Sequence, residues 1–258
     1  MYFGIDIGHN APPDTGAVFG QHREDILTKQ VGELVIKKLK QRGHRAVSVT
    51  PRRTFGARTI DRIRYSLRQR ARTANRLRVD YFVSIHFNAA GNRSAGGTEV
   101  FVYNSHSPAK SLAQEVLNEI VSLGFRNRRV KTGNFAVLRY TNMPAILIEC
   151  CFLTSAEDMQ LFNAEKMATA IVDGLVGKSD DDEGIPGTLN VNVSTYAKPS
   201  TDQASTIKRE DLYNIEVGKY QGKLLADEEA HYKVELEQSI GERKVHYIYS
   251  GHAEFIAE

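Results

Sequence analysis

The sequence predicts a three-layer α/β domain, with a central mixed, mostly parallel sheet flanked by helices, followed by a small all-β domain. Two observations support this prediction. From Met1 to about Lys178, short apolar runs alternate with segments of helical periodicity, which is typical of α/β layers. After about Gly187 only short segments of alternating polarity remain, separated by turn residues, as in small β-barrels or sandwiches.

The elements of the first domain follow one another along these runs. Apolar runs bounded by polar or turn residues predict strands at 2–7, 46–49, 81–85, 98–103 and 145–148. Apolar residues spaced three or four apart predict helices at about 25–41, 60–77, 108–123 and 155–176. Gly43 and Gly124 are expected to end two of these helices. Ser155 and Asp158 form a capping-box-like start of the last helix.

Composition sets the expected domain division. We expect a first domain at 1–177, a linker at 178–187 and a small β domain at 188–258. The linker reads KSDDDEGIPG, a charged and then Gly/Pro-bearing stretch that cannot bury apolar area. Beyond it, strands are expected near 189–193, 213–217, 231–236 and 245–249.

Composition and charge also limit the class of protein. The chain has 258 residues, 41% of them hydrophobic, which suits soluble globular domains. No apolar stretch approaches the ~20 residues of a membrane span, and the start lacks the features of a secretory signal. We therefore expect a protein made in the cytoplasm, without membrane insertion, that reaches an outside substrate only after release. The net charge of +3 permits attraction to nucleic acid or to an anionic cell wall.

The two cysteines, Cys150 and Cys151, are adjacent and lie in an apolar segment. Neighbouring cysteines rarely form a disulfide because the ring is strained, and the pair lacks a metal-binding CxxC spacing. We expect two small buried hydrophobic residues on a central strand.

Four polar residues form a candidate metal site. His9, His86 and Glu149 each follow or end an apolar run, and the carboxyl ends of buried strands carry the active sites of open α/β sheets. Two histidines and a carboxylate suit a catalytic zinc with one open position. The sequence therefore predicts His9, Glu24 and His86 as zinc ligands. Glu149 is the expected acid/base, taking a proton from the attacking water and giving it to the leaving amine.

Each of these residues has an alternative interpretation. A lone histidine after a strand is more often a surface or capping residue. Glu149 lies within PAILIECCFL, where an ionised side chain is costly to bury without a partner. Its alternative is a buried ion pair with an arginine.

Longer motifs connect these residues. They are FGIDIGHN, HRED around Glu24, LRQRARTAN, DYFVSIHFNA, GGTEVFVY, FAVLRYTNMPAILIECCFLT and Asp158. In their order and spacing they resemble the zinc-dependent N-acetylmuramoyl-L-alanine amidases, over about Met1 to Lys178. The resemblance implies cleavage of the amide between N-acetylmuramic acid and the L-alanine of the peptidoglycan stem peptide, with Zn²⁺ as cofactor. It implies the same ligands and the same catalytic glutamate, and Asn88 and Arg139 are expected to contact substrate.

The chain departs from this family pattern at two places. Cys151 stands where E-x-G-F usually has glycine, which leaves Glu149 in register. The first motif reads GHN rather than GHG and is followed by Pro12 and Pro13, so we expect an altered cleft shape. Some family members cover the zinc with a long insertion, but between Tyr103 and Phe135 there is room for one helix and a short connection only. We therefore expect a permanently open site.

Three other functions have weaker support. A zinc peptidase acting on stem peptides uses similar ligands, but usually with a histidine and an acid very close in sequence. A non-catalytic wall-binding protein needs an incomplete ligand set, and none of the four residues is missing. The arginines of the second helix region suggest a nucleic-acid surface, but without interleaved aromatic residues we favour a solvated face with some arginines paired to acids. The arginines of this region are Arg58, Arg62, Arg64, Arg68, Arg70, Arg72, Arg76 and Arg78.

The C-terminal region ends in HYIYSGHAEF and resembles the SH3-like domains appended to wall hydrolases. This resemblance implies a cell-wall-binding module, and the alternative is a merely stabilising domain. His246 and His252 are expected to be structural or surface residues. The expected partner is peptidoglycan and the expected state a monomer, without nucleic acid. A phage endolysin and a bacterial autolysin both remain open.

Overall fold

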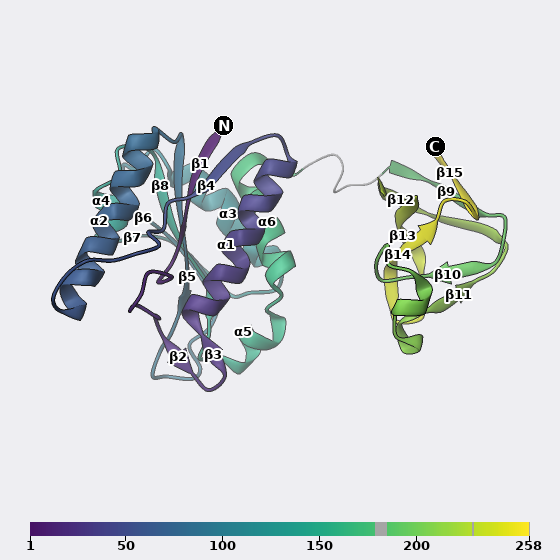
Figure 1. Cartoon of the computed structure of the whole chain (residues 1–258), viewed down its shortest axis with the longest axis horizontal. Coiled ribbons are helices and arrows are strands. Elements are labelled where there is room, and N and C mark those ends of the chain that lie inside the picture. Colours follow the sequence, from purple (N-terminus) through teal and green to yellow (C-terminus); the bar gives the residue numbers. More distant parts are fainter. Residues whose placement is uncertain (179–184, 229, 258) are drawn as a thin grey trace. The chain divides into compact units, whose positions relative to one another are not determined.

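The computed structural model describes residues 1–178, 185–228 and 230–257 (Figure 1). The chain divides into two compact units, Met1–Gly177 and Lys178–Glu258. In the first unit a six-stranded mixed sheet lies between two layers of helices, and the second unit is all-β. The predicted fold class is therefore confirmed for both units. Among the described residues, no helix is long and apolar enough to cross a membrane.

The sheet of the first unit has the order β4-β1-β5-β8-β6-β7. All neighbouring strands are parallel except β6 and β8. The strands are β4 (Arg45–Ser48), β1 (Tyr2–Ile7), β5 (Tyr81–Asn88), β8 (Ala145–Phe152), β6 (Thr98–Val102) and β7 (Asn127–Thr132). A separate short hairpin, β2 (Val18–Phe19) and β3 (His22–Arg23), precedes the first helix. The central strands are apolar on both faces because helices cover both.

Helices cover the two sheet faces unequally, as Figure 1 shows. One face packs against α1 (Glu24–Gln41), α3 (Lys110–Ser122) and α6 (Ala164–Val176), and this is the larger apolar core. The other face packs against α2 (Thr59–Leu77) and the short α4 (Ala136–Arg139), with a smaller core. Among the described residues, the second face is therefore covered by fewer helices than the first.

Both cysteines lie in the larger core. Cys150 and Cys151 are free and fully buried, as predicted. Cys151 leaves Glu149 in register, since Glu149 pairs with His86 across β5 and β8.

The end of the first unit differs from the prediction of one helix. The chain forms α5 (Ala156–Leu161) and then α6, because Phe162 is extended and the Asn163 side chain caps α6 by accepting the Lys166 N–H. Ser155 caps α5 through the Asp158 N–H, as predicted.

Asp158 has a different role from the one that a capping box gives it. Its buried carboxylate accepts the backbone N–H groups of Gly97 and Phe152, each at 2.8 Å. It thereby joins the start of β6 to the end of β8.

Strand β7 is a second difference, because the sequence prediction had only a connection there. Its sequence NRRVKT is polar and lacks the apolar alternation by which strands are recognised. Edge strands often carry charged residues, which keep the open side of the sheet from pairing with another chain. The preceding helix, α3, packs against α6 in the larger core.

The second unit contains a five-stranded antiparallel sheet in the order β14-β13-β12-β9-β15. Its strands are β14 (Arg243–Tyr249), β13 (His231–Ile240), β12 (Gly218–Glu228), β9 (Ile185–Val191) and β15 (Ala253–Ala257). A two-stranded sheet pairs β10 (Thr195–Ala197) with β11 (Tyr213–Ile215), and the turns η1 (Ala204–Thr206) and η2 (Arg209–Asp211) lie between them. A bridge between Lys198 and Tyr247 connects the two sheets. The unit has its own apolar core.

The predicted linker, 178–187, needs a correction at its end. Residues 179–184 lie outside the described part of the chain, but Ile185 to Gly187 belong to β9. They pair with β12, and Gly187 also pairs with β15. The β fold therefore begins before the predicted residue 188, because sheet pairing includes residues whose Gly/Pro content suggested a linker.

Candidate active site

The candidate ligands meet at the carboxyl end of the parallel strands. His9 lies two residues beyond β1, and His86 lies near the end of the neighbouring strand β5. Glu24 is the first residue of α1, where the helix dipole favours a negative charge. Three segments distant in sequence thus bring two imidazoles and a carboxylate together.

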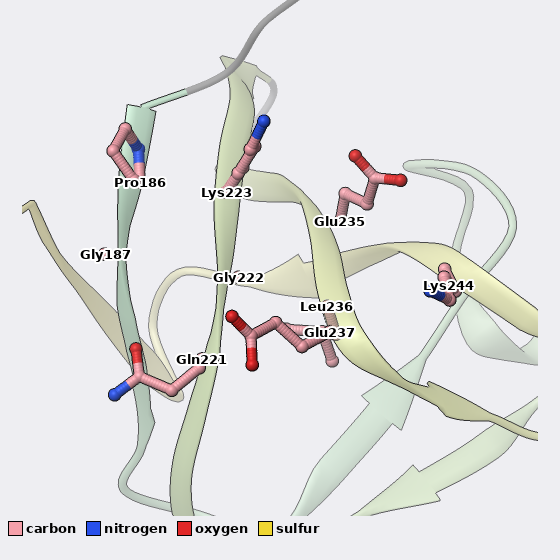
Figure 2. A pocket seen from close by; sticks show the side chains of 9 residues that line it. All are labelled: Pro186, Gly187, Gln221, Gly222, Lys223, Glu235, Leu236, Glu237 and Lys244. Carbon is pink, nitrogen blue, oxygen red and sulfur yellow. The ribbon is translucent and has the colours of Figure 1, made fainter.

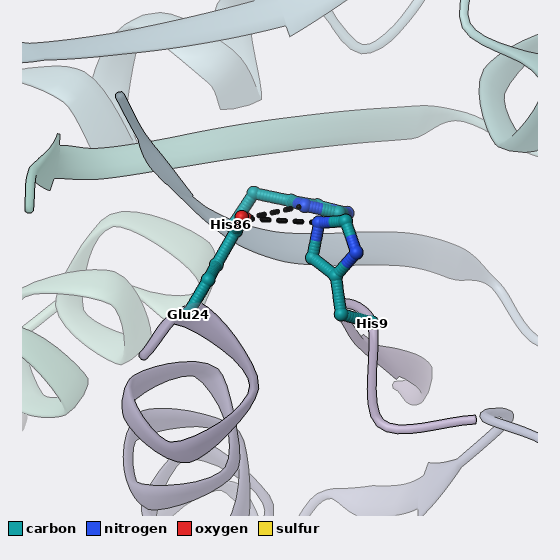
Figure 3. Close-up of side chains that lie close together, drawn as sticks. All are labelled: His9, Glu24 and His86. Carbon is teal, nitrogen blue, oxygen red and sulfur yellow. Dashed lines mark hydrogen bonds and ion pairs between the residues drawn. The ribbon is translucent and has the colours of Figure 1, made fainter. Parts of the chain in front are cut away.

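One oxygen of the Glu24 carboxylate contacts both histidine rings, which lie next to each other (Figure 3). Its Oε1 is 3.1 Å from Nε2 of His9 and 3.1 Å from Nδ1 of His86. The potential ligand atoms of the three residues all lie within 4.8 Å of one another. The backbone N–H of Phe87 donates to Oε1 at 3.1 Å, and that of Ala17 donates to Oε2 at 2.9 Å. These contacts fix a buried carboxylate in one orientation, and the group can hold a metal ion.

Two glycines make room for this group. A Cβ at Gly8 would lie 2.7 Å from Cε1 of His86, and a Cβ at Gly16 would lie 2.6 Å from Oε2 of Glu24. Gly16 also has a φ of +64°, a conformation that glycine adopts without strain. A side chain at either position would displace a ligand.

His9 itself has a φ of 62°, which is uncommon for a residue with a side chain and often occurs at functional sites. Its Nδ1 is 2.8 Å from Oδ1 of Asp14, so the other ring nitrogen, Nε2, faces Glu24. A carboxylate of this kind orients a metal-binding histidine and fixes its tautomer. The sequence prediction did not include Asp14, because a loop aspartate five residues beyond His9 has no periodic signal.

A buried ion pair holds the segment that carries His9. Arg70 on α2 pairs with Asp6 on β1, and both side chains are at most 3% exposed. Arg70 also donates to the backbone carbonyls of Ile7 and His9, at 2.9 and 3.3 Å. Seven of the eight arginines singled out in the second helix region are exposed, as expected, but Arg70 is buried. It therefore positions the His9 loop and does not belong to a solvated face.

Hydrogen bonds and charge couple the protonation of the candidate ligands. Burial disfavours the charged form of His9, but hydrogen bonds to Asp14 and Glu24 outweigh it and raise its pKa to about 10. Burial also disfavours ionised Glu24, but hydrogen bonds to His86 and His9 outweigh it and hold its pKa well below the usual range. A carboxylate that is ionised at neutral pH suits a cation-binding role. A metal ion held by this group would have to displace the proton of His9.

Glu149 lies in the same cleft but has the opposite environment. The cleft has a volume of about 330 Å³ and is lined by His9, Glu24, His86 and Glu149, with apolar side chains from α2, α4 and β8. Oε2 of Glu149 is buried and, within the described part of the chain, has no hydrogen-bond partner. Burial raises its pKa to about 7, with Glu24 and Glu99 adding to the effect against His86 and His9. Among the described residues Glu149 forms no ion pair with an arginine. The alternative interpretation of Glu149, as one half of a buried ion pair, is therefore wrong.

The sequence of the first unit matches a known family. A family model described as N-acetylmuramoyl-L-alanine amidase matches residues 4–177. The chain belongs to this family. The match ends at the last residue of the first unit, which we therefore term the amidase domain.

Individual relatives agree with the family match. The chain is 34% identical over 179 residues to N-acetylmuramoyl-L-alanine amidase LytC of Bacillus subtilis, covering 67% of this chain but only 34% of LytC. It is 30% identical over 196 residues to the endolysin of Bacillus phage SPP1, covering 72% of this chain and 65% of the endolysin. The crystal structure of an N-acetylmuramoyl-L-alanine amidase from Clostridium difficile 630 matches with a TM-score of 0.58 at 36% identity, covering 68% of this chain and 94% of that chain.

The two residues expected to contact substrate lie in different places on the amidase domain. Asn88 lines the cleft, where its Nδ2 donates to Glu99 at 2.9 Å. Arg139, at the end of α4, is exposed and donates to the Tyr140 hydroxyl at 2.8 Å. It is not among the residues that line the cleft.

A second hollow lies on the C-terminal unit, over β9, β12, β13 and β14 (Figure 2). Its volume is about 350 Å³, and its lining residues include exposed side chains of both charges, among them Lys223, Glu235, Glu237 and Lys244. Among the described residues no histidine, cysteine and carboxylate cluster of metal-ligand type occurs there. His246 is buried in this unit and its ring nitrogen Nε2 lies 3.0 Å from the backbone carbonyl of Arg243.

Proposed function

We propose that the chain is a zinc-dependent amidase that hydrolyses the bond between N-acetylmuramic acid and L-alanine of the peptidoglycan stem peptide. The observation that carries the proposal is the buried Oε2 of Glu149, which has no hydrogen-bond partner among the described residues and lies in one cleft with a preassembled histidine–glutamate–histidine group. An acid/base needs a pKa near the working pH, and that of Glu149 is raised to about 7.

The residues fit a zinc ion. Two imidazole nitrogens and a carboxylate oxygen are a donor set that catalytic zinc sites use together with an open position. His9, Glu24 and His86 would hold the ion, and Asp14 orients His9 from behind. When bound, zinc supplies a Lewis acid that polarises the scissile carbonyl and makes a neighbouring water more acidic.

The chain's own residues carry the proton. Glu149 takes a proton from the attacking water and returns it to the alanine nitrogen as the amide breaks. Its buried Oε2 has no competing partner within the described residues, so the carboxylate is free to make both transfers. The apolar lining of the cleft lowers the local dielectric and strengthens these interactions.

The test is metal removal followed by product analysis. Full-length protein treated with a strong chelator should lose activity on purified peptidoglycan and regain it with stoichiometric zinc. The products should show new L-alanine amino termini without new reducing sugar ends. Activity that survives complete zinc removal would contradict this mechanism, and cleavage within the stem peptide would favour the zinc peptidase instead. Wall binding without any cleavage would favour the non-catalytic alternative.

For the C-terminal unit we propose an SH3-like, wall-binding role. Its support is a separate core and a polar hollow of about 350 Å³ on its sheet. A chain ending at Lys178 should bind intact walls less well but hydrolyse soluble muropeptide normally. The opposite result would indicate a merely stabilising domain.

The site of action follows from the substrate. We propose that the protein acts on the cell wall, as a monomer with an open cleft, in either an endolysin or an autolysin. The relatives include a bacterial amidase and a phage endolysin, which is consistent with both alternatives.

A further inference from the structure

A charged cluster continues the sheet surface beyond Glu149, and the mechanism above does not use it. Glu99 on β6 lies directly opposite Glu149 on β8, so the two side chains are on the same sheet face. Arg128 and Lys131 on the edge strand β7 both reach Glu99. Asn88 contacts Glu99 from the cleft side. The strand order therefore places these groups in a row across the sheet, from the candidate metal ligands through Glu149 and Glu99 to the two cations.

Glu99 is buried, only 4% exposed, and such a carboxylate requires good partners. Its Oε2 accepts from Nε of Arg128 at 2.7 Å and from Nζ of Lys131 at 2.5 Å. Its Oε1 accepts from Asn88 at 2.9 Å. Burial opposes ionisation, but the hydrogen bonds from Lys131 and Arg128 outweigh it and hold the pKa of Glu99 below its usual value. Glu99 thus anchors both cations at fixed positions.

The two cations retain binding capacity. Two positive charges against one carboxylate leave a net charge of +1 in this cluster. The side chains of Arg128 and Lys131 are 29% and 39% exposed. The Arg128 guanidinium lies over the ring of Phe152, 4.8 Å from its centroid. Within the described part of the chain, Nη2 of Arg128 has no acceptor and the Lys131 ammonium has one, so both can donate to an anion.

We propose that Arg128 and Lys131 form a subsite that binds a carboxylate of the stem peptide on the leaving-group side of the scissile amide. This inference rests on the proposed function, in which Glu149 protonates the leaving nitrogen. The leaving peptide then starts at Glu149 and crosses β6 toward β7. Neighbouring strands are about 4.8 Å apart, so β7 is roughly 10 Å from β8. About three extended residues span that distance.

The carboxylate has two sources, an acidic side chain or substituent within the stem and the free C-terminus. Three synthetic N-acetylmuramoyl tripeptides distinguish them: one with an acidic second residue, one with that acid amidated, and one with a C-terminal amide. We expect zinc-loaded, full-length protein to cleave one amidated substrate with a KM about tenfold or more higher, since a charged hydrogen bond is lost. The affected amide identifies the source.

Variants then connect this preference to the two residues. Lys131→Gln and Arg128→Gln, each made alone, leave Glu99 with one cation and so protect folding. Each should raise the KM of the acidic substrate about tenfold, with kcat nearly unchanged, and should not affect the amidated one. Lys131→Arg should retain the preference. Lys110→Ala, which removes an exposed cation at the start of α3, is the control and should change nothing.

Two results would overturn the inference. One is wild-type protein that cleaves all three substrates equally. The other is variants that lower kcat equally on all of them, which would mean that the cations only adjust the charge near Glu149. Failure of the proposed function has a different signature, namely no amide cleavage of any substrate. Calorimetric binding of the three peptides to Glu149→Gln protein decides the subsite even then, because it needs no turnover.

Discussion

The amidase cleft and the hollow on the C-terminal sheet are similar in volume, but they treat charged side chains in opposite ways. In the cleft Glu24 is 4% exposed and held by two histidines and two backbone N–H groups. Oε2 of Glu149 is buried there and has no hydrogen-bond partner in the described part of the chain. In the hollow, Lys223, Glu235 and their charged neighbours are exposed on regular strands.

The difference shows that groups which lower the stability of the fold lie in the cleft and not in the hollow. A buried carboxylate oxygen without a hydrogen bond and a non-glycine residue at positive φ both cost free energy. Among the described residues the cleft has both, in Oε2 of Glu149 and in His9. Exposed charges on a sheet contribute little to stability. Strong perturbation of ionisable groups is typical of catalytic sites, whereas an exposed polar surface suits reversible binding. Matched substitutions in the two regions test this comparison.

The largest expected effect is on catalysis. Glu149→Gln keeps the shape of the side chain but removes its capacity to accept a proton, so kcat should fall about 10³-fold. Zinc content should stay at the wild-type level. The same change in the hollow, Glu235→Gln, is the matched control and should leave kcat within twofold. Substantial activity in zinc-loaded Glu149→Gln protein would assign the proton transfer to another group.

A second prediction concerns the stability of metal-free protein. The pKa of Glu149 is raised from 4.5 to about 7, so between these values the folded state binds the proton more tightly than the unfolded state. Stability is therefore lost as pH rises through this window. Relative to Glu149→Gln, wild type should lose about 3 kcal/mol between pH 4.5 and 7.5. Urea unfolding across that range measures it.

The reference in this series is Glu235→Gln, the same substitution at an exposed glutamate. A Glu149→Gln difference from wild type that does not change with pH would show that the Glu149 carboxyl group is not perturbed. The comparison between the two regions would then lose its physical basis.

A smaller effect is expected for metal affinity. Asp14→Asn keeps a hydrogen-bonding side chain beside His9 but removes the charge that orients the ring, and zinc affinity should fall about 10- to 100-fold. Competition with a chelator of known affinity measures this change. The control is Asp61→Asn, which changes an aspartate of α2 that pairs with Arg58. Equal zinc affinity in both variants would limit Asp14 to a structural role.

The smallest effects are expected in the hollow. Lys223→Ala combined with Lys244→Ala should change the free energy of unfolding by less than about 0.5 kcal/mol. Hydrolysis of soluble muropeptide should stay at the wild-type rate, whereas binding to intact walls should weaken. Pelleting assays with purified walls measure the binding. Unchanged wall binding would place the contact surface elsewhere on the C-terminal unit.

The parts of the fold that the sequence predicts are those with a strong local pattern. Apolar runs gave the central strands, and the ends of these runs placed His9, His86 and Glu149 on one edge of the sheet. Glu24 was predictable because it stands at the start of a periodic helix. The mixed sheet and the family followed from the order of these motifs.

Contacts that depend on loop path and on the sheet edge were not predictable. The turn at His9, with its φ of 62°, brings Asp14 next to the His9 ring. Such a turn produces no periodic pattern in the sequence. Strand β7 is polar, so its pairing with β6 depends on the rest of the sheet. Arg70 occurs in a run of exposed arginines, and only the fold brings it to Asp6.

Asp158 has a consequence for how this enzyme can be altered. One carboxylate outside the cleft clamps the N–H groups that begin β6 and end β8, the two strands that carry Glu99 and Glu149. The loop at residues 89–95 leads into this clamp, so its length can change while the two glutamates keep their spacing. Insertions in that loop are therefore expected to change which substrates the protein can contact, while Glu99 and Glu149 keep their positions.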